Sequence, residues 1–397
     1  MSNKINIQYF RQPKFYKDFQ CAGDKCPVNC CYGWGIIGWK KEEYEKIKNA
    51  KMPMELRSKF ENSFKPTENE RYKGIYDYQI EYTNERKCPL LTENGLCRIQ
   101  KELGADYLSH VCMVYPRNGY HCGNTILRTC QLSCVHVMKK ICNDENSMEL
   151  ENNFKVERID FKPDYETKDY INYPHLKYHR ELFEFFYELL SDKTHSIETS
   201  IVLGAMAAQK IDDFIKKRQH DRIPEIIKAL KPQLNNPAQI EKLENAKPNI
   251  SLKGNVAFAV LKALKDSNIY QNIFENGNPS EEKWQEGMDK WNAVFKDRPY
   301  VLRNIALNLY ISQSMPFRDK TLSLFENFCY LAAEMCVIKF LAAAVSIQFD
   351  RTEEMFEIAV SNVDREFTHN DVNVKTVIDV LHAFGINSPA YLMGILK

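Results

Sequence analysis

The sequence lacks an excess of either charge, a repeat of fixed period and any low-complexity tract. Of its 397 residues, 54 are Lys or Arg and 53 are Asp or Glu, so the formal net charge is only +1. Because binding to nucleic-acid phosphates requires a net basic surface that releases counterions, we expect no nucleic-acid partner. The hydrophobic content of 44% is typical of a globular protein, and the length leaves room for roughly two or three domains.

The N-terminal segment also lacks the apolar core of a secretory signal, since MSNKINIQYFRQPKFYKDF is mixed and aromatic. We therefore expect a cytoplasmic protein. The longest apolar run, residues 328–349, is long enough to span a bilayer but carries Glu334 and Lys339 in its interior. A buried core helix is the better interpretation, so we predict no transmembrane segment. Peripheral membrane association and the oligomeric state stay open.

Cysteine is abundant but unevenly distributed. Of 13 cysteines, only Cys329 and Cys336 lie beyond Cys142. Cytoplasmic thiols stay reduced, so a disulfide framework is not expected, and cysteines that serve as small apolar residues would be scattered through the chain. The clustering predicts metal ligation in the N-terminal region.

The spacing of these cysteines matches neither a zinc ribbon nor the usual radical S-adenosylmethionine motif. The segment 21–31 has the pattern C-x4-C-x3-C-C, and the segment 88–97 has the pattern C-x8-C. Zinc ribbons carry paired C-x2-C knuckles, and Gly33 stands where a C-x3-C-x2-C motif from Cys26 would need its third cysteine. Iron–sulfur clusters accept many spacings when four thiolates converge. A cluster and a structural zinc ion therefore both stay open.

Three glycines after the cysteines, Gly33, Gly35 and Gly38, form the pattern G-x-G-x-x-G, which binds a dinucleotide when it lies in a βαβ unit. Here cysteines and polar residues precede the first glycine in place of a buried strand, and no parallel-strand alternation follows. We therefore interpret the glycines as a close turn that leaves the metal site, ahead of a helix that begins at Trp39.

Alternation predicts a small β-hairpin over about 75–100. Tyr76, Tyr78 and Tyr82 alternate with polar residues as on one face of a strand, and a turn signal at 93–95 precedes a second strand at 96–99. Cys88 and Cys97 would lie on the two arms of this hairpin. Helical patterns follow over 101–112 and 126–142.

From residue 174 onward the apolar spacing is helical throughout. We therefore predict a mainly α protein. It comprises a cysteine-rich metal-cluster domain over 1–142 with the small β-hairpin, a linker or strap over 143–173, and an irregular α-helical domain over 174–397.

Four groups of residues carry a family pattern. They are CAGDKCPVNCCYGW at 21–34, KCPLL and NGLCRIQ within 87–100, DYLSHVCMVYPR at 106–117 and LSC at 132–134. With them the chain closely resembles the flagellin lysine N-methylase family. The resemblance is dense over about 15–140 and thinner over the helical remainder, where NIALNLYISQSMPF at 304–317 looks like a family segment. The first group also resembles small proteins that chelate zinc or iron through a C-x3-C-C core.

The resemblance implies an enzyme that transfers methyl groups from S-adenosylmethionine to lysine side chains of its protein substrate, flagellin. It also implies a 4Fe-4S cluster in the cysteine-rich region, with zinc as the alternative metal. Carried over by position, the candidate metal ligands are Cys21, Cys26, Cys30, Cys31, Cys88, Cys97, Cys112 and Cys134. Eight thiols exceed the need of one cluster, so either four of them hold a single cluster or a second metal takes the others. Cys122, Cys130 and Cys142 fall outside the family pattern.

Two positions depart from that pattern: Met113 stands where an arginine is usual, and Val135 where a proline is usual. The pattern identifies neither a catalytic residue nor the S-adenosylmethionine site. His110 and Tyr115 flank Cys112 and are candidates for hydrogen bonding or proton transfer, and Arg117 is a candidate partner for a carboxylate. The alternative function is a non-catalytic zinc or iron–sulfur protein that acts as an adaptor or redox sensor.

Overall fold

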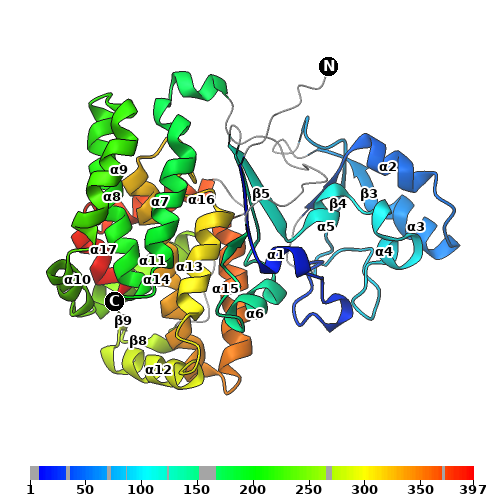
Figure 1. Ribbon diagram of the computed structural model, residues 1–397. Helices are drawn as coiled ribbons and strands as arrows, with labels where there is room; N and C mark the ends of the chain where they lie inside the picture. The colour runs from blue at the N-terminus through cyan, green and yellow to red at the C-terminus, as the bar shows by residue number, and fades with distance from the viewer. Residues whose placement is uncertain are drawn as a thin grey trace. The chain divides into compact units, whose positions relative to one another are not determined.

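The computed structural model describes residues 9–32, 36–68, 73–85, 87–122, 125–151, 167–264, 271–368 and 372–397. The chain forms two compact units, coloured mainly blue to cyan and green to red in Figure 1. The cysteine-rich unit comprises Phe19–Asn118 and Cys134–His136, and the helical unit comprises Met1–Asp18, Gly119–Ser133 and Val137–Lys397. These units divide the chain at positions other than the expected boundaries at 142 and 173. The described structure is mainly helical, as predicted.

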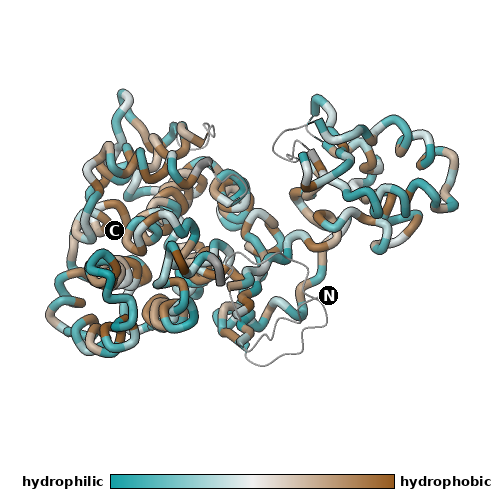
Figure 2. Tube along the Cα trace, turned by 90° about the horizontal axis from the view of Figure 1, so that it is seen from above, coloured by the Kyte–Doolittle hydropathy of each residue, from teal (hydrophilic) through white to brown (hydrophobic). Residues whose placement is uncertain are grey.

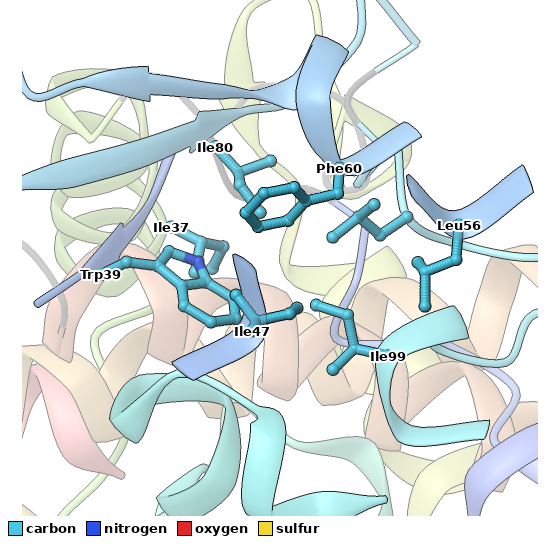
Figure 3. Close-up of a cluster of buried hydrophobic side chains, with 8 residues drawn as sticks. Ile37, Trp39, Ile47, Leu56, Phe60, Ile80 and Ile99 are labelled. Atoms are coloured by element: carbon cyan, nitrogen blue, oxygen red, sulfur yellow. The ribbon is translucent and has the colours of Figure 1, made fainter. Parts of the chain in front are cut away.

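The cysteine-rich unit contains an antiparallel three-stranded sheet, in the order β2-β4-β3. The strands are β2 (Ile36–Trp39), β4 (Tyr78–Glu81) and β3 (Phe64–Pro66). Helices α2 (Lys41–Lys48), α3 (Met54–Ser63), α4 (Arg98–Leu103) and α5 (His110–Val114) belong to the same unit. Its apolar core is a cluster whose side chains point toward one another in Figure 3, formed by Ile37, Trp39, Ile47, Leu56, Phe60, Ile80, Leu90 and Ile99.

The predicted hairpin is only half correct. Strand β4 forms where the tyrosines alternate, but its partners are β2 and β3, and the second predicted strand at 96–99 is wrong because α4 begins at Arg98. The helix predicted over 101–112 is also interrupted, since Gly104 has a φ of +94° and ends α4. Left-handed backbone favours glycine, which makes that residue a natural break.

Gly38 lies within strand β2 and not in the turn expected from the glycine pattern. A Cβ atom at Gly38 would lie 2.2 Å from the ring of Tyr76, so the glycine allows this ring to pack directly on the strand. The antiparallel sheet agrees with the exclusion of a dinucleotide loop, which needs a parallel βαβ unit. Gly33 and Gly35 lie outside the described residues.

The helical unit begins with a four-stranded sheet that the sequence did not predict. Its order is β5-β6-β1-β7, with β5 (Arg117–Cys122), β6 (Thr125–Cys130), β1 (Tyr9–Pro13) and β7 (Leu150–Glu151). The helix expected over 126–142 is therefore wrong in its first half, and only α6 (Val135–Cys142) is helical. A short, mostly buried segment such as ILRTC does not distinguish a strand from a helix by its periodicity.

The helical structure predicted from residue 174 onward is confirmed by the helices that follow. They are α7 (His179–Ser191), α8 (Ile197–Lys216), α9 (Ile223–Leu234), α10 (Pro237–Glu244), α11 (Ile250–Ala263), α12 (Glu281–Val294), α13 (Val301–Ser312), α14 (Leu324–Gln348), α15 (Thr352–Thr368), α16 (Val372–Ala383) and α17 (Pro389–Leu396). Hydrophobic and hydrophilic positions are interleaved along these helices in Figure 2.

Helix α14 is the central element of the helical unit. Within the described part of the chain it is the one helix long and apolar enough to cross a membrane, yet its most apolar window is fully buried. Helices α8, α11, α12 and α15 pack around it. Its interior ionisable side chains have partners, since Lys339 Nζ lies 2.6 Å from a Glu198 carboxylate oxygen and Glu334 accepts a hydrogen bond from Gln313. The expected buried core helix is confirmed.

Replacing Gly287 in α12 with alanine should destabilise the helical unit, although alanine is the better helix former. A Cβ atom there would lie 2.4 Å from the carbonyl oxygen of Ala343 in α14, so the helices must separate, at a cost of about 1–3 kcal/mol. Gly394→Ala in α17 is the matched control, because its nearest neighbour would be 3.5 Å away. Urea unfolding measures both variants, and equal stabilities would contradict the close packing of α12 on α14.

The buried Glu357 in α15 should make the helical unit less stable as the pH rises. Desolvation, and then the charge of Glu353, raises the pKa of Glu357 from 4.5 to about 7. The folded state therefore holds a proton that the unfolded state has already released, and stability falls as the pH rises through this window. Between about pH 5 and pH 8 we expect the wild type to lose about 1–2 kcal/mol more than Glu357→Gln, which stays neutral. Parallel urea titrations at the two pH values should show this difference, and identical pH dependences would refute it.

Candidate functional site

Two loops of the cysteine-rich unit are joined through their backbones. The Cys88 N–H donates to the Cys31 carbonyl at 2.8 Å, and the next pair outward, Tyr32 and Lys87, forms an antiparallel bridge. Asn29 fixes the loop that contains Cys31, because its Oδ1 accepts the Cys31 N–H at 2.8 Å. Its Nδ2 donates to the Gly95 carbonyl, in the loop that links Cys88 to Cys97. This pairing places the Cys30-Cys31 pair beside Cys88.

The loop that follows Cys88 turns back and places Cys97 near Cys88, without forming the predicted second strand. Leu91 and Cys97 form an antiparallel bridge, and the Arg98 N–H donates to the Leu90 carbonyl at 2.9 Å. Gly95 has a φ of +76°, in the left-handed region that this tight turn uses. Cys97 immediately precedes α4 and packs with Cys88 against the apolar core.

Five of the eight predicted ligands influence one another electrostatically. The pKa of Cys31 is raised, first by a hydrogen bond with Cys30, then by desolvation and by the charges of Cys30, Cys88 and Cys97. Desolvation, reinforced by the charges of Cys97 and Cys30, raises the pKa of Cys88 to about 12. The pKa of Cys112 also rises to about 12, by desolvation and by the charges of Cys97, Cys88 and Cys30. Cys112 nevertheless keeps solvent-exposed surface, so the charges of the neighbouring thiols act on it beside desolvation.

These thiols form a neighbourhood, not a finished coordination site. Among the described residues no group of three or more His, Cys, Asp or Glu side chains already has a metal-binding arrangement. The thiolates of these cysteines repel one another and so raise one another's pKa. A bound cation would offset this repulsion and stabilise the thiolates. The structure therefore brings together Cys30, Cys31, Cys88, Cys97 and Cys112.

The other three predicted ligands belong to the same unit. Cys21 is exposed and its sulfur accepts the Gly23 N–H at 3.4 Å, whereas Cys26 donates to the Val28 carbonyl at 3.1 Å. Cys134 is half-buried at the start of the short segment Cys134–His136. All eight candidates thus fall in the cysteine-rich unit, while the three cysteines outside the family pattern, Cys122, Cys130 and Cys142, are buried in the helical unit.

Ser109 is a site residue that the sequence analysis missed. It is fully buried, and its hydroxyl accepts the Cys112 N–H at 3.2 Å as the N-terminal cap of α5. It also donates toward the Cys112 sulfur and so opposes the rise in the thiol pKa. The Ser-x-x-Cys spacing at the start of a helix is the signal that identifies such a cap.

Tyr78 and Tyr82 of the predicted tyrosine face both pack against the apolar core, and Tyr82 also adjoins the thiols. Tyr78 stacks on Tyr44 with ring centres 3.7 Å apart and therefore belongs to the core. Tyr82 adjoins the thiols: desolvation, and then the charges of Cys88, Cys31, Cys112 and Cys30, raises its pKa. Tyr82 thus lies close to the cysteine neighbourhood.

Two further candidates act through backbone contacts. The His110 N–H donates to a Glu43 carboxylate oxygen at 2.8 Å, which ties α5 to α2. Arg117, a candidate partner for a carboxylate, donates in the described structure to the Phe19 carbonyl at 2.6 Å and lies over the Phe19 ring. Both residues stabilise the cysteine-rich unit around Cys112.

The family segment of the helical remainder, residues 304–317, forms most of α13 and the turn after it. Its polar side chains are buried. Asn304 Nδ2 donates to the carbonyls of Ile141 and Asp144, each at 3.0 Å. Asn308 Nδ2 donates at 3.1 Å to the Cys130 carbonyl and to the Thr129 hydroxyl. These asparagines attach α13 to β6 and to the end of α6.

Comparison with known proteins identifies the family. The model of the FliB lysine N-methylase C-terminal domain matches residues 183–395, more than half of the chain. The flagellar biosynthetic protein FliU of Salmonella muenchen is 33% identical over 141 residues, which are 35% of this chain and 80% of that protein. No solved structure matches.

Two proteins named lysine-N-methylase, from Salmonella choleraesuis and Salmonella typhimurium, are each 32% identical over 139 residues. These residues are 35% of this chain and 34% of each relative, so the match spans about a third of their length. The family model extends the resemblance over the helical remainder, because it covers α7 to α17 almost entirely. The chain belongs to the FliB lysine N-methylase family.

Proposed function

We propose that this protein is a lysine N-methyltransferase that methylates flagellin, with S-adenosylmethionine as the methyl donor and a 4Fe-4S cluster in the cysteine-rich unit. The match to the FliB C-terminal domain carries the proposal. Two relatives are named lysine-N-methylase, which supports lysine as the methylated residue. A third is named a flagellar biosynthetic protein, which supports flagellin as the substrate. We place the enzyme in the cytoplasm, where the thiols stay reduced.

The thiols of the cysteine-rich unit fit a metal cluster in their chemistry. A 4Fe-4S cluster takes four thiolates, and five thiols already share one neighbourhood, Cys30, Cys31, Cys88, Cys97 and Cys112. Cluster binding would hold them deprotonated and remove their mutual repulsion. A bound cluster supplies iron that can bind polar groups or exchange electrons. Ser109 and Tyr82 would adjoin it, and Ser109 would orient the Cys112 thiolate through a hydrogen bond.

Methyl transfer to a lysine requires the neutral amine, because the nitrogen lone pair attacks the methyl carbon of the sulfonium. The protein must lower the pKa of that amine or accept its proton, and must hold nitrogen, carbon and sulfur in line. Since the amine already carries a lone pair, the transfer does not require a radical. The cluster can therefore serve structure or donor binding without electron transfer.

Cys88→Ala should strongly reduce metal binding. Anaerobically purified wild type should be brown and contain about four iron and four sulfide ions per chain, whereas Cys88→Ala should lose most of both. Cys329→Ala is the matched control, because this buried cysteine lies on α14 in the helical unit, and it should keep the wild-type iron and sulfide content. A colourless wild type with stoichiometric zinc would contradict the iron–sulfur assignment.

The activity itself is tested with the same anaerobic preparation. With S-adenosylmethionine labelled in its methyl group, we expect label on lysine residues of flagellin from the same cell, located by mass spectrometry of peptides. Flagellin whose lysines are already dimethylated chemically is the control and should take up little label. A protein that binds metal but transfers no label to flagellin would indicate the non-catalytic adaptor or redox sensor.

A further inference from the structure

The helical unit contains a cavity of about 540 Å³ that none of the predicted site residues lines. Strand β1 contributes Arg11, helix α7 contributes Glu184 and Tyr187, and helix α13 contributes Arg303 and Asn304. All of these residues belong to the helical unit, so the cavity lies within one compact body. Its volume is in the range of sites that bind cofactors and drug-sized molecules, about 300–1,000 Å³.

Charges of both signs line this cavity. Arg11 Nε lies 2.8 Å from a Glu184 carboxylate oxygen, and Lys193 Nζ lies 2.6 Å from one of Glu145. Arg303 is buried and donates to the Ser200 hydroxyl at 3.2 Å and to backbone carbonyls. Such a balanced lining favours a ligand that itself carries both charges over a polyanion or a simple cation.

Aromatic and apolar side chains complete the lining. Tyr187 and Tyr300 contribute rings, and Met148 and Leu307 contribute apolar surface. The Tyr187 hydroxyl donates to the Met148 carbonyl, which fixes this ring in place. Tyrosine faces attract cations such as a sulfonium and stack on flat heterocycles.

Most of the lining belongs to the part of the chain that defines the family. Glu184, Tyr187, Tyr300, Arg303 and Asn304 all lie within 183–395, the range that the FliB model matches. A ligand that every member of a methylase family needs is the methyl donor. The protein substrate, in contrast, can differ from one member to another.

We propose that this cavity is the binding site of S-adenosylmethionine, an inference that rests on the proposed function. The donor carries an ammonium and a carboxylate at one end, which correspond to the paired Glu184 and Arg11. Its sulfonium and adenine correspond to the tyrosine rings and the apolar surface. A lysine side chain carries only a cation and a narrow stem, so it would use little of this volume.

Isothermal titration of the full chain with S-adenosylhomocysteine, after anaerobic purification with its metal, tests the assignment. Glu184→Gln removes a charge from the cavity, and we expect about tenfold weaker binding. Ser191→Phe, at the end of α7, fills the cavity with a ring and should weaken binding at least as much. Glu181→Gln is the matched control, since it removes the same charge one turn away on the exposed side of α7 and outside the lining. Unchanged thermal unfolding would show that the variants are folded.

The outcomes separate this assignment from the proposed function. Wild-type affinity in both cavity variants would overturn the cavity as the donor site, while a methylase that binds its donor elsewhere would still stand. Loss of flagellin binding with unchanged S-adenosylhomocysteine binding would make the cavity the acceptor site. If removal of the metal, and not the cavity variants, abolished binding, the donor would bind at the metal. A wild type that binds neither S-adenosylhomocysteine nor S-adenosylmethionine would remove the proposed function as well.

Discussion

The burial of helix α14 is the constraint on which the helical unit depends. A helix this apolar has to be covered on every side in water, and its neighbours do so at van der Waals contact, as the approach of Gly287 to the Ala343 carbonyl shows. The charges inside it must then be paired, because an isolated buried ion is costly. Lys339 is paired with Glu198 of α8, and it also donates to the Leu396 carbonyl at 2.9 Å, at the end of α17. The ion pair therefore joins α14 to α8, and the hydrogen bond joins α14 to α17.

The same requirement explains why α13 is rich in buried amides. Asparagine offers two N–H donors without a charge, so it can satisfy carbonyls that loops and strand ends leave open. Asn304 and Asn308 do this for the end of α6 and for β6, and they attach the small sheet to the helices. Asn304 also lines the cavity, so one residue of the family segment contributes both to the fold and to the candidate donor site.

The sequence predicted the parts that rest on periodicity or composition. The helices and the burial of α14 could be predicted because apolar spacing persists over long segments. The cysteine set could be predicted because cysteines that serve as small apolar residues would be scattered through the chain. Strand β6 was not readable, since its short buried run satisfies helix and strand equally. The cavity could not be predicted at all, because Arg11 and Glu184 are far apart in the sequence and only tertiary packing brings them together.

The core of the cysteine-rich unit bears on what a metal would do there. Eight buried apolar residues form its central cluster, and small units with limited cores commonly depend on disulfides or metals for stability. Every cysteine in the described structure is a free thiol, and Cys88 and Cys97 pack directly against that cluster. A metal held by these thiols would close the loops that Asn29 and the Cys31–Cys88 hydrogen bond already bring together, so its binding energy would add to folding energy. A structural role for any metal bound in this unit thus follows from the limited size of its core.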